Sequence, residues 1–196
     1  FSINPFNLDL KVDLGNYKIS KILSLNHILD ELVKTELLYN DNISANISLK
    51  AISNAKNEIF QNANINFNFN KCIRDSNKTK LINKKIGSLK LENSNLFFKE
   101  DRLILNTDIL IDIKNSDELF SLLQTSKKSR KLIKKILINM NYDFLTKQID
   151  FNVVKIDNNK VNNKLLSIID GFNDNNVNNL NKSRNILNEI LGAYEG

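Results

Sequence analysis

The sequence contains very few of the residues from which most catalytic and metal-binding sites are built. Its 196 residues include one cysteine, one histidine and five glycines. The lone Cys72 excludes a disulfide within the chain, and the lone His27 has no second histidine or cysteine with which to hold zinc. Five glycines are too few for a glycine-rich phosphate loop, and no nucleophile is spaced with a base in a recognisable way. We therefore expect a protein that is not an enzyme and that binds no cofactor or metal.

Long apolar runs are also missing. No stretch reaches the roughly 18 apolar residues of a membrane-spanning helix, and no leader peptide precedes the strand-like pattern near Phe1. We expect the chain to be a piece of a longer protein. The composition, 41% hydrophobic and 26% charged, is typical of a folded chain. The net charge of +6 permits association with an anionic partner, a membrane surface or nucleic acid, and does not choose between them.

Residues 103–113 show the clearest structural pattern in the chain. Leu105, Ile109 and Ile111 occupy alternate positions, and Asn106 and Asp108 lie between them. Successive side chains of a strand point to opposite sides of a sheet, so this pattern predicts a strand with one apolar and one polar side. Similar alternation predicts further strands over residues 6–14, 43–51, 63–69, 79–82, 86–98, 136–142 and 148–157. In the last of these, Ile149, Phe151 and Val153 are expected on one side.

Two departures from simple alternation carry information. The apolar positions in residues 86–98 change phase at residues 93–95, which indicates a turn or a β-bulge. Elsewhere the apolar spacing becomes helical, over residues 24–38, 116–124, 161–172 and 180–194. Ser24 and Ser116 are the expected N-caps of the first two helices.

These elements predict a β-rich α+β protein. We expect a curved antiparallel sheet, arranged as a meander, with amphipathic helices covering one face or one end. The sheet domain with its inserted helices is expected to span residues 1–157, and a helical segment to span residues 158–196.

Two polar groupings are candidates for a functional role. Asp108 and Asp112 share one side of a strand, but they alternate with other polar residues, so a solvated surface explains them better than acid–base chemistry. The basic run over residues 127–135 could meet phosphates of lipid or nucleic acid. It has no interleaved aromatic residues for base stacking, and a solvated turn with a helix end explains it better than either kind of phosphate binding.

The apolar sides of the strands are the main unusual feature. They could form an ordinary closed core against helices or a second sheet. Alternatively, part of the surface could stay open as a groove for an acyl chain. The pattern alone favours the closed core, because a large exposed apolar surface promotes aggregation.

The chain resembles the C-terminal region of AsmA-like proteins, a bacterial envelope family related to bridge-like lipid transfer proteins. The stretches that carry this resemblance are residues 67–70, 81–96, 103–113 and 131–157. The chain departs from the family pattern at residues 71–75, where these proteins tend to have a glycine turn after a strand.

The resemblance implies a periplasmic protein, anchored to the inner membrane by a part of the parent chain outside this sequence. It also implies a long curved sheet whose apolar inner surface helps to move phospholipid between membranes in outer-membrane biogenesis. Phospholipid would be the partner, with no role for nucleic acid. The alternative is a structural or protein-interaction module with a closed core. The residues expected to line the apolar surface are Ile65, Phe67, Phe69, Leu89, Leu91, Leu105, Ile109, Ile111, Ile138 and Phe151.

Overall fold

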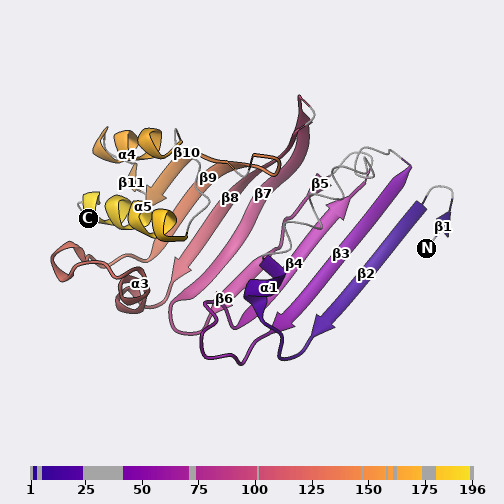
Figure 1. The fold of residues 1–196 in the computed structure, drawn as a ribbon, viewed down its shortest axis with the longest axis horizontal. Coiled ribbons are helices and arrows are strands. Elements are labelled where there is room, and N and C mark those ends of the chain that lie inside the picture. The colour runs from indigo at the N-terminus through magenta and orange to yellow at the C-terminus, as the bar shows by residue number, and fades with distance from the viewer. Residues whose placement is uncertain are drawn as a thin grey trace.

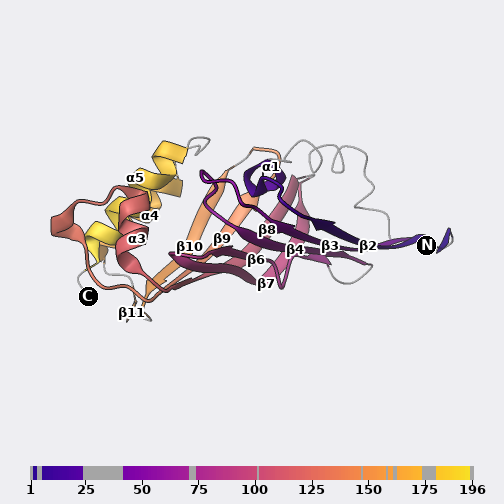
Figure 2. The ribbon, with the colours of Figure 1, turned by 90° about the horizontal axis from the view of Figure 1, so that it is seen from below.

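The computed structural model describes residues 2–3, 6–23, 42–70, 74–100, 102–146, 148–157, 159–160, 163–173 and 180–194. Its centre is one eleven-stranded sheet, which is mostly antiparallel and twists across its width (Figures 1 and 2). The spatial order is β1-β2-β3-β4-β6-β7-β8-β9-β10-β11, with β5 paired to β4. This confirms the predicted β-rich α+β fold with a curved sheet. The strands are β1 (Ser2–Ile3), β2 (Phe6–Leu14), β3 (Ile43–Ile52), β4 (Asn62–Phe69), β5 (Arg74–Asp75), β6 (Lys80–Asn83), β7 (Gly87–Lys99), β8 (Arg102–Ile113), β9 (Lys135–Asp143), β10 (Ile149–Ile156) and β11 (Asn159–Lys160).

One strand pair departs from the predicted antiparallel meander, because β2 and β3 run parallel. A parallel pair needs a long crossover rather than a tight turn, and here 28 residues, numbers 15–42, separate the two strands. The described part of this crossover contains the short helix α1 (Ile19–Leu23). The helix predicted over residues 24–38, with Ser24 as its N-cap, lies outside the described residues.

The phase change in residues 93–95 is a β-bulge inside a single strand. Glu92 pairs with Asp108 and Asn95 with Asn106, so β7 carries one more residue than β8 between these pairs. Asn93 has a φ of 50°, in the left-handed region that asparagine tolerates better than most residues. The extra residue compensates for the phase change, so that Leu89 and Leu96 lie on the same side of the sheet.

A second bulge corrects one sequence prediction. The register between β9 and β10 shifts between Phe151 and Val153. Val153 is therefore turned to the solvent side and is 41% exposed, whereas Val154 and Ile156 are buried. The prediction that Val153 shares a side with Phe151 was wrong, because the bulge reverses the alternation at this point.

The remaining helical elements lie between β8 and β9 or after β11 in the chain. They are α3 (Ser116–Leu123), the 3₁₀ turn η2 (Lys127–Ser129), α4 (Asn163–Asn173) and α5 (Leu180–Ala193). The N-cap of α3 is Asn115, not the predicted Ser116. The Asn115 side-chain oxygen accepts the backbone N–H of Asp117 at 3.0 Å and of Glu118 at 3.2 Å. Helix α1 and helices α3–α5 lie on the same side of the sheet, over different strands (Figure 2).

Candidate apolar binding surface

The ten predicted lining residues all lie on one side of the sheet. Residues that pair across neighbouring strands share a side, and the printed registers link Ala63 to Leu81, Leu81 to Leu89, and Leu89 to Ile111. The same side continues from Ile111 to Ile136 on β9. Alternation along each strand places the rest of the set on this apolar side, which extends without interruption from β2 to β10.

Helix α1 covers one part of the apolar side. Its Ile19 and Ile22 are 0% and 8% exposed, and they pack against Ala63 and Ile65 of β4 and Leu81 of β6. The predicted lining residues Ile65 and Leu89 belong to this group, and Phe67 also packs against it. Ile65 is therefore buried within the protein.

Helices α3, α4 and α5 cover the part of the apolar side formed by β8, β9 and β10. Phe120 of α3, Ile169 of α4 and Leu191 of α5 enter one core with Ile138 and Val154. The rings of Phe151 and Phe172 stack with centroids 4.5 Å apart and an interplanar angle of 7°. The predicted lining residues packed in this region are Ile109, Ile111, Ile138 and Phe151.

A third group on the apolar side consists of strand and turn residues, and we call it the strand-only cluster. No helix of the described part of the chain contributes to it. Phe67 and Phe69 stack at 6.1 Å, and Phe144 meets Tyr142 edge-on at 4.9 Å. Its inner members are buried, whereas its outer members remain half-buried. The cluster comprises Leu8, Ala45, Phe67, Phe69, Leu96, Phe98, Leu103, Leu105 and Phe144.

The predicted lining residues are thus divided among three surroundings. Phe67, Phe69 and Leu105 belong to the strand-only cluster. Leu91 is half-buried and belongs to none of the three groups. The sequence-based list omitted Phe98 and Phe144. Phe98 alternates with Leu96 beyond the bulge, so its side could be assigned only once the bulge was known, and Phe144 lies in a turn, where no alternation exists.

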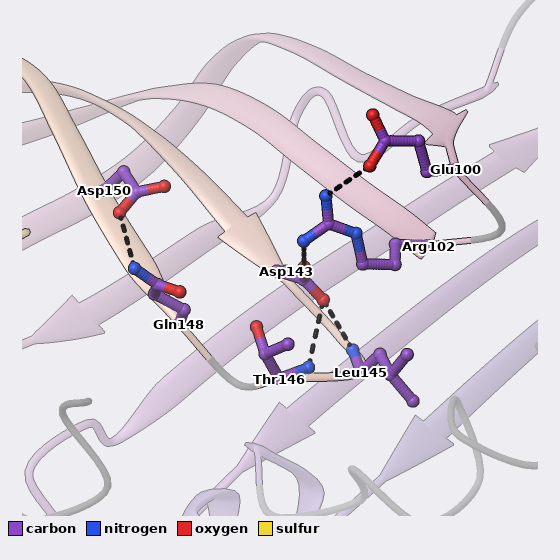
Figure 3. A network of polar contacts seen from close by, with 7 residues as sticks. All are labelled: Glu100, Arg102, Asp143, Leu145, Thr146, Gln148 and Asp150. Carbon is purple, nitrogen blue, oxygen red and sulfur yellow. Dashed lines mark hydrogen bonds and ion pairs between the residues drawn. The ribbon is translucent and has the colours of Figure 1, made fainter.

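A polar network holds this turn in place beside the strand-only cluster (Figure 3). Asp143, 9% exposed, accepts the N–H groups of Leu145 and Thr146 at 2.8 and 3.0 Å. Arg102 donates to Asp143 and to Glu100, each at 3.3 Å. These bonds join the ends of β8 and β9, so they fix the backbone that carries Phe144.

The opposite side of the sheet is polar, as its sequence pattern predicts. Asp108 accepts side-chain N–H groups from Asn93 and Asn139, both at 2.7 Å. Asp112 forms an ion pair with Lys90 at 3.3 Å. Both carboxylates thus have partners within the sheet surface.

Some of the described residues line hollows on the polar side and at one end of the sheet. Among the described residues, no three histidine, cysteine, aspartate or glutamate side chains are grouped so that they could hold a metal ion. Within the same residues, no helix has the length and hydrophobicity needed to cross a membrane.

Comparison with family models, curated proteins and solved structures finds no match to this chain. The similarity to AsmA-like proteins therefore remains a prediction from the sequence.

Proposed function

We propose that this protein is a non-enzymatic component of the bacterial envelope that shields phospholipid acyl chains on the apolar side of its sheet. The observation that carries the proposal is the strand-only cluster. It presents Phe67, Phe98, Leu105 and Phe144 as half-buried side chains, and no described helix contributes a residue to it. Phe67 also packs against the group that helix α1 covers. Apolar and aromatic side chains on a rigid sheet provide the surface that an acyl chain requires.

The energetics suit a carrier. Removing each methylene of an acyl chain from water contributes roughly 0.8 kcal/mol. A bilayer offers the same stabilisation, so a surface that merely matches it can exchange lipid with a membrane at little net cost. No polar side chain needs to recognise the hydrocarbon, and the headgroup would remain at the sheet margin.

Contacts within the protein limit where an acyl chain could lie on the apolar side. Ile65, Ile138 and Phe151 pack against the protein's own helices, so an acyl chain would reach them only after a helix moved. We therefore propose that the acyl chain lies along Phe67, Phe69, Leu91 and Leu105. Phe98 and Phe144, which the sequence-based list omitted, would also contact it. Periplasmic location, inner-membrane anchoring elsewhere in the parent chain and a role in outer-membrane biogenesis belong to the same proposal, and sequence resemblance supports them.

The second candidate function is a structural or protein-interaction module with a closed core. The observation that favours it is the extent to which the helices seal the apolar side. Phe120, Ile169 and Leu191 are all at most 4% exposed where they meet β9 and β10. In this case no lipid would be carried.

The lipid content of the purified protein distinguishes the two candidate functions. Organic extracts of the purified chain, analysed by mass spectrometry, should contain phospholipid in stoichiometric amounts. A photoreactive residue in place of Phe98 should crosslink to it. The variant Leu105→Asn should lose most of the bound lipid, whereas Ile104→Asn, one position along the same strand on the polar side, should retain it.

Circular dichroism would establish that both variants are folded. Extracts without phospholipid from a folded wild-type chain, or equal lipid loss in the two variants, would refute the carrier function and favour the closed module.

A further inference from the structure

Four lysines surround a hollow at the end of the sheet where β8 finishes and β7 begins, at the lower edge in Figure 1. Its lining also includes Ile82, Ser88 and Asp112 from the polar side of the sheet. We call this region the basic edge, and its lysines are Lys80, Lys84, Lys114 and Lys134.

Gly87 allows the strands to approach closely at the basic edge. Its φ is +147°, and a Cβ built there would lie 2.0 Å from the carbonyl oxygen of Asp112. Two backbone hydrogen bonds hold the adjoining segments of the same chain. The N–H of Lys114 donates to the carbonyl oxygen of Ile86 at 2.7 Å, and the carbonyl oxygen of Lys134 accepts the N–H of Ile113 at 2.7 Å. The side chains of Lys114 and Lys134 therefore extend from ordered backbone.

Among the described residues that line the basic edge, lysines outnumber carboxylates. Asp112 contributes a carboxylate to the lining, but it is paired with Lys90. Within the described part of the chain, none of the four lysines takes part in an ion pair. Such a grouping attracts phosphate-type anions.

An exposed leucine adjoins this charge. Leu132 is 73% exposed, and with Lys134, Lys135 and Asp157 it lines a second hollow that shares Lys134 with the first. Asp157 accepts the backbone N–H groups of Lys134 and Lys135 at 2.9 and 2.8 Å, so it caps the loop. An apolar side chain set among lysines is a combination suited to a lipid interface.

We infer that the basic edge docks on an anionic lipid surface, with headgroup phosphates between its lysines and Leu132 inserted among the lipids. Charge complementarity and the exposed leucine both fit this partner. Nucleic acid would use the lysines alone, because the hollows are lined by no aromatic side chain on which a base could stack. Docking does not rest on the proposed acyl-chain carriage, since a protein can bind a bilayer without extracting lipid from it.

Sedimentation with vesicles tests the inference. At about 0.1 M salt the chain should bind vesicles of phosphatidylcholine with 30% phosphatidylglycerol, and not phosphatidylcholine alone. Each lysine close to an anionic surface contributes about fivefold in affinity, so Lys114→Gln/Lys134→Gln should weaken binding by roughly 10- to 30-fold. The matched pair Lys11→Gln/Lys99→Gln has the same net charge, but its positions lie elsewhere on the sheet, and it should weaken binding less than threefold.

A separate pair of variants tests the role of Leu132. Leu132→Ser should weaken vesicle binding by about three- to tenfold through lost apolar contact. Leu145→Ser should change it less than twofold, because Leu145 is 66% exposed but lies in the turn at the opposite end of β9.

Four results would overturn the inference. These are equal losses in the two lysine pairs, equal binding to both vesicle types, release from vesicles by millimolar inorganic phosphate or glycerol phosphate at constant ionic strength, and binding to an RNA or DNA oligonucleotide in place of vesicles. Retained vesicle binding by Leu105→Asn would show that docking and acyl-chain shielding are separate properties.

Discussion

The contact between Phe151 and Phe172 helps to hold helix α4 to the sheet, and its removal has a predictable cost. Phe172 is 3% exposed, and its ring stacks on Phe151 at 4.5 Å. Truncation of a buried phenylalanine to alanine costs about 3–5 kcal/mol, which includes both lost transfer energy and the cavity left behind. We expect Phe172→Ala to cost about 3–4 kcal/mol, because the helix that carries it can partly collapse into the cavity. A domain is stable by only about 5–15 kcal/mol, so this is a large fraction.

Urea unfolding followed by circular dichroism measures this cost. Leu166→Ala is the control on the same helix, because Leu166 is 47% exposed and should cost less than about 1 kcal/mol. A cost below 1 kcal/mol for Phe172→Ala would refute the conclusion that α4 is anchored on β10. Hydrogen exchange adds a second readout: loss of protection confined to α4 and α5 would support the predicted separate segment over residues 158–196.

Three further changes test local features. Gly87→Ala should destabilise by about 3 kcal/mol, measured by urea unfolding, since the added Cβ meets the backbone of Asp112 at 2.0 Å. Ser94→Ala should cost about 2 kcal/mol in the same assay, because the buried N–H of Ser76 loses its 2.7 Å acceptor. Glu58→Gln should cost less than about 1 kcal/mol at pH 7 and nothing in acid, measured as thermal stability against pH.

The sign of the last prediction follows from the contacts of Glu58. The Ser20 hydroxyl donates to this carboxylate at 2.6 Å, and the Ser20 backbone N–H donates at 2.9 Å. The hydroxyl bond lowers the pKa of Glu58 most, the N–H and nearby Lys18 act in the same direction, and burial opposes them. A lowered folded-state pKa gives stability that is present above the unfolded-state pKa and is lost as the pH falls through the folded-state value. A Glu58→Gln effect that grew in acid would contradict this.

Simple controls accompany the other two changes. Gly15→Ala should cost far less than Gly87→Ala, because nothing lies within 4 Å of a Cβ at Gly15. Ser129→Ala removes a solvent-exposed serine pair with Ser126, so it should cost less than about 0.5 kcal/mol. Equal costs within either comparison would show that close approach or burial is not the cause.

Most strands could be predicted from sequence because strand alternation is a local signal. The register between strands aligns the apolar sides of neighbouring strands, so Phe67, Leu105 and Ile138 lie on one side of the sheet, as their patterns implied. Alternation also signalled the β7 bulge, although not its type. The β10 bulge left no comparable sign, because Val153 and Val154 are adjacent and chemically identical.

Features that depend on tertiary contacts were harder to predict from the sequence. Asn115 and Ser116 are both good N-caps, and the extended backbone of Asn115 at the end of β8 selects it. The parallel pairing of β2 with β3 depends on the path of a crossover, which no local pattern encodes. The covering of Phe151 depends on a helix whose contacting residue lies 21 positions away. The sequence therefore could not predict which part of the apolar side would have no described helix packed on it, and the proposed site lies in that part.

The bulge in β7 also determines how this strand would tolerate a change in length. Because β7 carries one surplus residue opposite β8, deleting Asn93 would restore simple alternation without turning any leucine to the other side. After a one-residue deletion outside the bulge, at Lys90 for example, the surplus residue could restore the register only beyond the bulge, so Leu91 would turn to the polar side. Natural length variants of this strand should therefore concentrate at residues 93 and 94.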